Sequence, residues 1–292
     1  MSYFRPTALQ DALVALGHGP QVLAGGTDIY PANAQAHGWG APRLTHLRDR
    51  PILDVSGLLE LNGLRSVGDS IEIGALVTWH DAIHCDLPTW FNCVRLAGQE
   101  VGGPQIQNRG TLVGNLCNAS PAADGVPPLL VLDAKLRVQS ARGSREIALN
   151  QFISGNRQTL LADDEMVTTI VIPRAPASAQ STFLKLGARR YLVISIAMVA
   201  AFVDVQDHLV VDCRIAVGAC SEVAQRLPDL ERRVIGAPLK QAAGLVSASD
   251  VAELTPLDDI RASAQYRRRA ALELLRRALD ELARRPGQAN AA

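Results

Sequence analysis

The sequence predicts an α+β protein built from three regions. Three observations favour this class. Near the N-terminus, a strand, a glycine turn, a helix and a second strand follow one another. Short strands broken by turns fill the middle of the chain, and three strands precede one long helix at its end. The chain has 292 residues, 48% of them hydrophobic, which suffices for a large core in two or three subdomains. We place the regions at 1–57, 58–174 and 175–292.

The pattern of the first region predicts a βαβ unit. Apolar side chains recur at helical spacing after Thr7, a good N-cap residue, and glycines follow the last of them. The next strand runs into a glycine turn, which therefore lies at a strand's carboxyl end, where ligands bind in such units. The expected elements are a helix over 8–16, a strand over 21–24, a helix over 28–37 and a strand over 51–55.

The second region predicts a hairpin, two helices and a sheet. Aliphatic residues flank the turn signal Gly68-Asp-Ser70, and Thr78 is expected to cap a helix that runs from Trp79 to His84. Pro88 opens another helix, which reaches about Ala97. Short strands broken by turns favour an antiparallel or mixed sheet beside the first unit. The remaining elements of this group are expected at 127–132, 135–139, 146–149 and 165–172.

The third region follows a linker-like stretch, 173–180, that is rich in proline, alanine and serine. Strands are expected over 181–186, 197–205 and 209–218, with a turn at Asp207-His208. One long helix follows, roughly from Ser263 to Arg285, with leucines on its buried face and arginine pairs on its solvent face. Docking of a partner subunit is a second interpretation of these arginines.

Two glycine segments carry the clearest chemical signal. The first is Leu23-Ala-Gly-Gly-Thr-Asp28, and the second is Asn108-Arg-Gly-Thr-Leu-Val-Gly-Asn115. Glycine permits positive φ angles and close approach of the backbone, so that successive N–H groups can form a concave surface for phosphate oxygens. One such segment is a weak signal. Two segments, with the hydroxyls of Thr27 and Thr111 alongside, predict a clamp on a diphosphate.

Composition limits the setting of the protein. The formal net charge is zero, which gives no broad attraction to nucleic acid or to an anionic membrane. No apolar run is long enough to cross a bilayer, and the first residues lack the apolar core of a signal peptide. The five cysteines contain no Cys-x-x-Cys pair, so no metal site is indicated, and Cys117 stands out only because it follows the second glycine segment. We expect a cytoplasmic protein.

Five motifs, in order and at matching spacing, resemble one known family over essentially the whole chain. They are Ala24–Asp28, Gly103–Asn115, Ala119–Asp124, Asp164-Glu165 before a strand that ends at Pro173, and Phe183–Lys185. The chain is similar to the FAD-binding medium subunit of the molybdenum hydroxylases, the family of xanthine dehydrogenase and carbon monoxide dehydrogenase flavoproteins. This resemblance implies a two-subdomain FAD-binding domain of the p-cresol methylhydroxylase type. A C-terminal domain with a small antiparallel sheet and helices is implied to follow it.

The resemblance also implies which residues bind FAD, noncovalently because neither segment has a histidine or cysteine at an attachment position. It places the diphosphate on the backbone of 23–29 and 111–115 and a hydrogen-bonding carboxylate at Asp124. It places a backbone contact to the flavin at Val167 or its neighbour Met166, and a positive charge near the cofactor at Lys185. The implied set is Leu23, Ala24, Gly25, Gly26, Thr27, Asp28, Ile29, Val101, Thr111, Leu112, Val113, Gly114, Asn115, Asp124, Val167 and Lys185.

Two positions depart from the family pattern. The second glycine segment usually has two adjacent glycines before Asn115, and here Val113 replaces the first of them. A β-branched residue resists a positive φ, so either this position never needs one or the segment is rearranged. Val101 replaces an aromatic ring that some relatives carry beside the flavin. Asp124 and Lys185 also have simpler interpretations, as a turn cap and as a solvated strand residue.

The function implied by the resemblance is electron relay. A large partner subunit would carry the molybdenum cofactor, a small partner subunit would carry two [2Fe-2S] clusters, and the FAD of this chain would pass electrons to NAD, oxygen or another acceptor. The chain itself shows no acid–base or nucleophile set. Two alternatives stay open: a self-sufficient FAD-dependent oxidoreductase with its own small substrate, and a non-catalytic assembly subunit that has lost its flavin.

Overall fold

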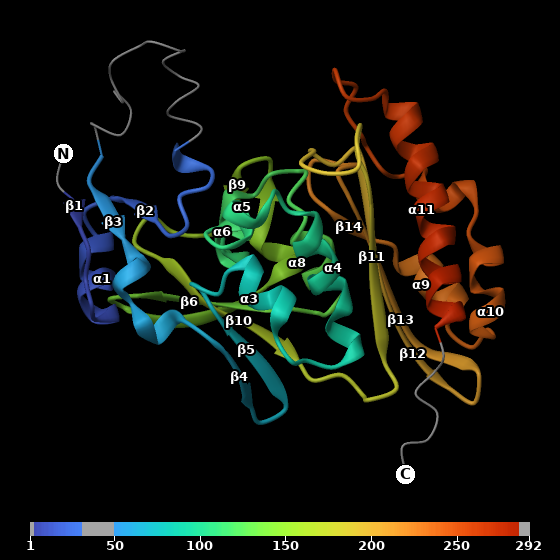
Figure 1. Ribbon diagram of the computed structural model, residues 1–292, viewed down its shortest axis with the longest axis horizontal. Helices are drawn as coiled ribbons and strands as arrows, with labels where there is room; N and C mark the ends of the chain where they lie inside the picture. The colour runs from blue at the N-terminus through green and yellow to red at the C-terminus, as the bar shows by residue number, and fades with distance from the viewer. Residues whose placement is uncertain (1–2, 31–49, 286–292) are drawn as a thin grey trace.

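The computed structural model describes residues 3–30 and 50–285. Three sheets follow one another along the long axis of the molecule (Figure 1). A three-stranded sheet lies at the N-terminal end, a five-stranded sheet in the middle and a four-stranded sheet at the C-terminal end. Helices separate or cover these sheets, which confirms the predicted α+β class. No helix within the described ranges combines the length and apolar character needed to span a bilayer.

The first sheet has the order β1-β3-β2 and is parallel. The parallel pairing of β2 with β3 is what the βαβ pattern predicts. The expected helix over 28–37 is helical at 29–30, and its remaining residues lie outside the described ranges. The elements are β1 (Tyr3–Phe4), α1 (Leu9–Leu16), β2 (Gln21–Leu23) and β3 (Ile52–Asp54).

The expected cap of the first helix is wrong. The N-cap position of α1 belongs to Ala8, and no side chain there accepts a hydrogen bond, so Thr7 does not cap the helix. The carboxylate of Glu60 accepts the N–H of Leu9 at 2.8 Å instead. A residue distant in sequence therefore satisfies this first-turn donor.

The middle sheet is antiparallel throughout, in the order β4-β5-β10-β6-β7. The predicted hairpin around Gly68 is confirmed, since β4 pairs with β5. A small separate hairpin pairs β8 with β9. The strands are β4 (Leu64–Val67), β5 (Ser70–Gly74), β6 (Lys135–Ser140), β7 (Gly143–Ala148), β8 (Ile153–Gly155), β9 (Gln158–Thr159) and β10 (Met166–Pro173).

Six helices accompany this sheet in the described ranges. Thr78 caps α3 in a capping box with Asp81, as predicted for the hydroxyl. The segment 127–132, grouped with the strands above, is a helix, because Pro127 and Pro128 occupy its first turn, where a fixed φ and a missing N–H are tolerated. The helices are α3 (Trp79–His84), α4 (Asn92–Glu100), α5 (Pro104–Gln107), α6 (Leu112–Asn118), α7 (Val126–Val131) and α8 (Leu149–Phe152).

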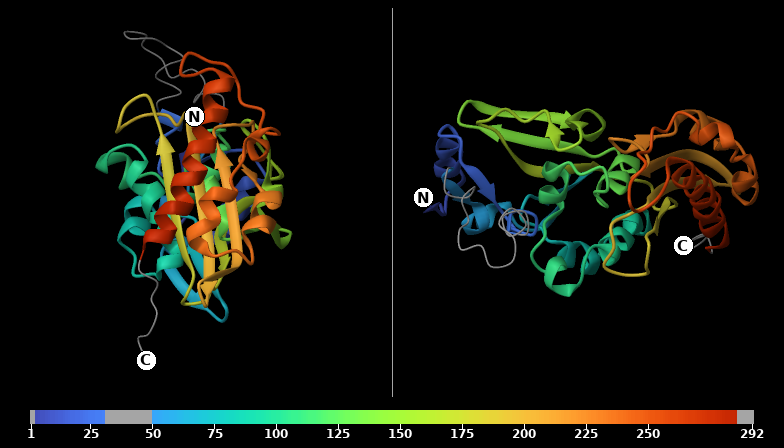
Figure 2. Two further views of the ribbon diagram at one scale, coloured as in Figure 1. Left: turned by 90° about the vertical axis from the view of Figure 1, so that its right-hand side faces the viewer. Right: turned by 90° about the horizontal axis from the view of Figure 1, so that it is seen from above.

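The C-terminal sheet is antiparallel, in the order β11-β12-β13-β14. Its outer face is covered by α11, which Ser263 caps, together with α9 and α10 (Figure 2, left). Helices α4 and α7 pack on the inner face, so this sheet lies between two layers of helices. The elements are β11 (Gln180–Leu186), β12 (Ala197–Gln206), β13 (Leu209–Gly218), β14 (Gln225–Arg226), α9 (Pro228–Val234), α10 (Leu239–Ala242) and α11 (Ala264–Arg284).

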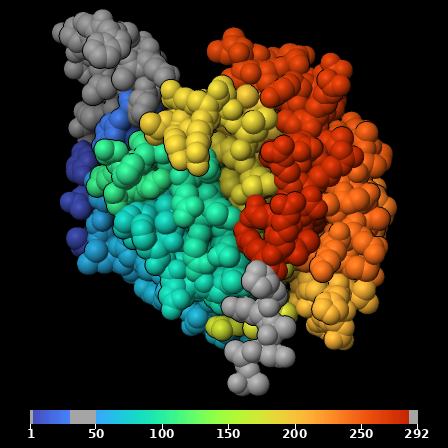
Figure 3. Space-filling view, turned by 45° about the vertical axis from the view of Figure 1, so that its right-hand side comes forward, coloured from blue at the N-terminus to red at the C-terminus, as the bar shows by residue number. Residues whose placement is uncertain are grey.

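The segment between β11 and β12 protrudes from the surface. Figure 3 shows it in yellow, between the N-terminal part of the chain and α11 in red. Tyr191, Leu192 and Ile194 are exposed on it, and Ser195 at its end is buried again. Short 3-10 turns at 55–57, 59–61, 89–91, 243–245 and 248–251 complete the regular structure of the described residues.

Candidate functional site

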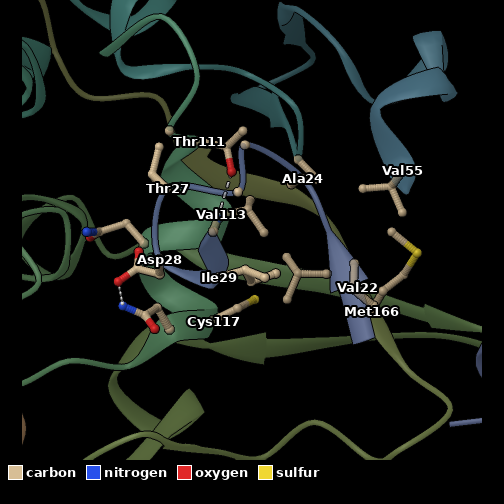
Figure 4. Close-up of a pocket in the computed structure, with 18 of the residues that line it drawn as sticks. Val22, Ala24, Thr27, Asp28, Ile29, Val55, Thr111, Val113, Cys117 and Met166 are labelled. Carbon is tan, nitrogen blue, oxygen red and sulfur yellow. Dashed lines mark hydrogen bonds between the residues drawn. The ribbon is translucent and has the colours of Figure 1, made fainter. Parts of the chain in front are cut away.

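A pocket of about 430 Å³ opens where the N-terminal and middle regions meet (Figure 4). Its volume falls in the range of roughly 300–1,000 Å³ that is usual for ligand sites. Apolar side chains such as Val22, Val55 and Met166 form one wall, and the glycine segments form the other. The lining residues that lie outside the implied set are Gln21, Val22, Val55, Ala75, Trp79, Ile106, Gly110, Cys117, Asn118, Leu161, Glu165 and Met166.

Both glycine segments line this pocket and lie directly against each other. A Cβ atom on Gly25 would stand 1.9 Å from the carbonyl oxygen of Arg109, so residue 25 has to be glycine for the segments to meet. A Cβ atom on Gly110 would stand 3.5 Å from the hydroxyl of Thr27. The two backbones that the sequence predicts to form one clamp therefore share one crevice.

The second segment is the start of a helix. The Thr111 hydroxyl accepts the N–H of Gly114 at 2.9 Å and so caps α6. Val113 lies in the first turn of this helix, in a right-handed conformation and almost fully buried. Position 113 therefore does not need a positive φ, so valine can replace the usual family glycine there without rearranging the segment.

Several backbone donors of the two segments remain available. The N–H groups of Gly26, Thr27, Asp28 and Val113 have no hydrogen-bond partner within residues 3–30 and 50–285. Gly26 has a φ of +74°, a conformation that glycine adopts without strain. Unpaired amides of residues that line one pocket fit a diphosphate, because each N–H can donate to a phosphate oxygen. The residues present therefore fit the diphosphate of FAD.

Trp79 supports the second segment from below. Trp79 is 2% exposed, and its backbone N–H donates to the carbonyl oxygen of Gly110 at 3.0 Å. Cβ atoms on Gly98 and Gly125 would stand 3.1 and 3.0 Å from the indole, so small residues make room for it. None of the motifs described above marks this tryptophan as a site residue, although a large aromatic directly after a helix cap beside two glycine segments is a usable signal.

Asp124 and Lys185 lie behind the pocket, outside its lining. The ammonium of Lys185 is 2.7 Å from Asp124 Oδ2, and its side chain is 3% exposed. The Ser195 hydroxyl donates to Asp124 Oδ1 at 2.6 Å. Burial raises the pKa of the Asp124 carboxyl, while Lys185 and Ser195 act to lower it. The simpler interpretations are thus wrong, because Lys185 is not solvated and Asp124 caps no turn.

This buried pair still touches residues that line the pocket. Lys185 donates to the carbonyl oxygen of Glu100 at 3.3 Å, and Val101 follows in the lining. The N–H of Gly125, next to Asp124, donates to Asn115 Oδ1 at 3.0 Å. Of the implied set, Leu23, Leu112, Asp124 and Lys185 lie outside the lining, and the other twelve lie in it: Ala24, Gly25, Gly26, Thr27, Asp28, Ile29, Val101, Thr111, Val113, Gly114, Asn115 and Val167.

Glu165 and Cys117 add opposite kinds of chemistry to the lining. Arg145 binds Glu165 through two hydrogen bonds of 2.8 and 2.7 Å and lowers the pKa of that carboxyl to about 2. Burial raises the pKa of the Cys117 thiol to about 12, so it is protonated near neutral pH and is a poor nucleophile. The lining thus offers a permanent carboxylate and an inert thiol.

Comparisons with known proteins agree with this geometry. Residues 1–175 match the family described as the FAD binding domain in molybdopterin dehydrogenase, and residues 182–282 match the CO dehydrogenase flavoprotein C-terminal domain. The nicotine 6-hydroxylase medium subunit of Paenarthrobacter nicotinovorans is 31% identical, with 96% of each chain covered. The xanthine dehydrogenase FAD-binding subunit of Escherichia coli O157:H7 is 31% identical over 91% of this chain and 90% of its own.

A solved structure shares the whole fold. A chain of the reconstituted CO dehydrogenase from Oligotropha carboxidovorans superposes with a TM-score of 0.86, at 25% identity and 98% coverage of both chains. The match spans the FAD-binding part and the C-terminal part alike, as the resemblance implied. The chain therefore belongs to the family of FAD-binding domains in molybdopterin dehydrogenases, and it is an FAD-dependent oxidoreductase subunit of the xanthine dehydrogenase-like molybdenum hydroxylases.

Proposed function

We propose that the pocket holds FAD noncovalently, with the diphosphate on the backbone of 23–29 and 111–115. The observation that carries this proposal is the set of unpaired amides from both segments in one pocket. The glycine at position 25 lets the two backbones close on the same ligand. Apolar side chains such as Val22 and Met166 would cover the rings and exclude water from them.

FAD supplies redox chemistry when bound, and the chain supplies its position and its electrostatic surroundings. We propose that Val167, or Met166 beside it, meets the flavin through its backbone, and that Val101 lies against the ring. Lys185 and Asp124 stand directly behind Val101 and Asn115, where they would act on the flavin through one layer of protein. We propose that the ammonium of Lys185, although it is paired with Asp124, favours the gain of electron density on the flavin.

We further propose that this subunit works as an electron relay between partner chains. Relatives of similar length are named as medium subunits or medium chains, including the glyceraldehyde dehydrogenase medium chain of Sulfolobus acidocaldarius, 30% identical over 97% of this chain. Such names support a large partner with the molybdenum cofactor and a small partner with [2Fe-2S] clusters. NAD, oxygen or another acceptor would take the electrons. The proposed compartment is the cytoplasm, where five free thiols are ordinary.

Reconstitution tests the cofactor proposal. Purified chain incubated with FAD and passed over a desalting column should keep a yellow flavin spectrum. Acid precipitation should then release all the flavin into the supernatant, because no covalent bond holds it. A colourless protein would support an assembly subunit without flavin, and flavin that stays in the pellet would contradict noncovalent binding.

Co-expression tests the relay. A tagged copy of this chain, produced with the neighbouring open reading frames, should retain a large and a small subunit on the affinity resin. Substrate of the large subunit should then bleach the flavin of the complex and leave the isolated chain unchanged. A small molecule that bleaches the flavin of the isolated chain would show a self-sufficient oxidoreductase instead.

A further inference from the structure

The charged lining of the pocket has the wrong sign for a diphosphate. Among the described residues that line it, the charged side chains are Asp28 and Glu165, both acidic. Arg145 neutralises Glu165 through its two hydrogen bonds. The carboxylate of Asp28 would repel a phosphate more strongly than that of Glu165, because Asp28 lies within the first glycine segment. A cation near this end of the pocket would offset the charge of Asp28.

Arg157 is the cation placed beside Asp28. It lies at the tip of the β8–β9 hairpin, and its Nη1 atom stands 4.0 Å from Asp28 Oδ1. Asn118 links the two, since its amide donates to Asp28 Oδ1 at 2.8 Å (Figure 4) and its side-chain oxygen accepts from Arg157. Both Asp28 and Asn118 line the pocket. The guanidinium therefore lies next to two lining residues, although Arg157 is not itself part of the lining.

Arg157 has an unusual backbone conformation. Its φ is +60°, and that of Ala119 at the end of α6 is +47°, left-handed conformations that non-glycine residues seldom adopt. The N–H of Arg157 donates to the carbonyl oxygen of Ala119 at 2.8 Å, so the two strained residues are bonded to each other. Such conformations are enriched at ligand-binding sites, although they also occur here in ordinary turns such as Asp207-His208.

The guanidinium also has donors to spare. The bonds of Arg157 to Asn118 and its contact with Asp28 all use Nη1. The Nε and Nη2 donors have no partner within the described residues, and 56% of the side chain is exposed. We propose that Arg157 is a cofactor-binding residue, whose free donors take a phosphate oxygen of FAD and whose charge offsets Asp28. This inference rests on the proposed binding of FAD.

Replacement of Arg157 by asparagine tests this role. Asparagine tolerates a left-handed conformation, so R157N keeps the hairpin backbone and removes the charge. Flavin fluorescence quenching should show FAD binding about five- to tenfold weaker, with ADP weakened as a competitor by the same factor. Riboflavin, which has no phosphate, should bind R157N and wild type equally. The charge-preserving variant R157K should recover part of the affinity.

Arg142 provides the matched control. It also lies on a hairpin turn, is exposed, and binds an aspartate, Asp164, through two hydrogen bonds. Asp164 does not line the pocket, whereas Asp28, the aspartate beside Arg157, does. R142N should bind FAD, ADP and riboflavin as wild type does. Unchanged FAD binding by R157N, a loss of riboflavin affinity as large as that of FAD, or an R157K variant as weak as R157N would each overturn the inference. Wild type that fails to bind FAD would refute the proposed function as well.

Discussion

The carbonyl oxygen of Arg109 occupies the space where any side chain on residue 25 would have to begin. The Cβ position of Gly25 lies 1.9 Å from that oxygen, far closer than real Cβ contacts come. The atom in the way belongs to the backbone, so it cannot move aside as the end of a flexible side chain could. The distance between the two glycine segments is therefore set by the absence of a side chain at one position.

G25A should separate the two segments and weaken FAD binding by about tenfold to a hundredfold, the effect expected when one methyl group is forced into a packed contact. Fluorescence titration with FAD measures the loss. G244A is the control, because a Cβ atom there meets nothing within 4 Å. FAD affinity of G25A equal to that of G244A would mean that the segments do not act together.

V113G restores the usual family glycine and should bring no gain in FAD affinity. Val113 is buried in the first turn of α6 with an ordinary φ, so its side chain acts by packing. Loss of that packing and of helix propensity should lower the free energy of unfolding by about 2–4 kcal/mol. Urea denaturation of the apoprotein measures this change. Tighter FAD binding by V113G would show that valine obstructs the cradle.

K185M should leave the buried Asp124 carboxylate unpaired and lower the free energy of unfolding by about 3–5 kcal/mol. The double variant K185M/D124L, which removes both charges, should be less destabilised than K185M, and urea denaturation compares them. R277M is the control, because the exposed pair of Arg277 with Glu273 should contribute less than about 1 kcal/mol. Additive losses in the double variant would argue against a coupled pair.

E165Q should change how stability depends on pH. Arg145 lowers the pKa of Glu165 from its ordinary 4.5 to about 2, so the folded state favours the charged form. The resulting stabilisation is complete above about pH 4.5 and is lost as the pH falls towards 2. Wild type should therefore keep its advantage over E165Q in urea denaturation above about pH 4.5 and lose it progressively between about pH 4.5 and about pH 2. A constant difference across this range would show that the pair is not formed.

Local sequence patterns predicted most of the helices and strands, but not the contacts between residues that lie far apart in the chain. The hairpin of β4 and β5, the cap at Thr78 and the long helix α11 follow from turn residues, a cap residue and apolar spacing, all within a few residues. The segment 127–132 could not be assigned to a strand or a helix by its pattern alone, because a short apolar run fits a strand or a buried helix equally well. The two prolines in its first turn were the signal that decides.

The site follows the same division between local and distant information. Glycine content marked both segments of the clamp, because a glycine requirement is visible in the chain itself. The pairing of Asp124 with Lys185, and the approach of Arg157 to Asp28, join residues that lie far apart in sequence. The sequence around each of these four residues contains no pattern that predicts its partner. The division of the chain at 57 and 174 stays a prediction.

The contact of Ser195 and Lys185 with Asp124 bears on how this subunit can be engineered. One carboxylate from the flavin half is held by two side chains that enter from the other half. A chimera that joins this N-terminal half to the C-terminal half of a relative would have to import both donors in register, or strand a negative charge in the interior. The C-terminal half of a relative can therefore replace this one only if it supplies both donors to Asp124.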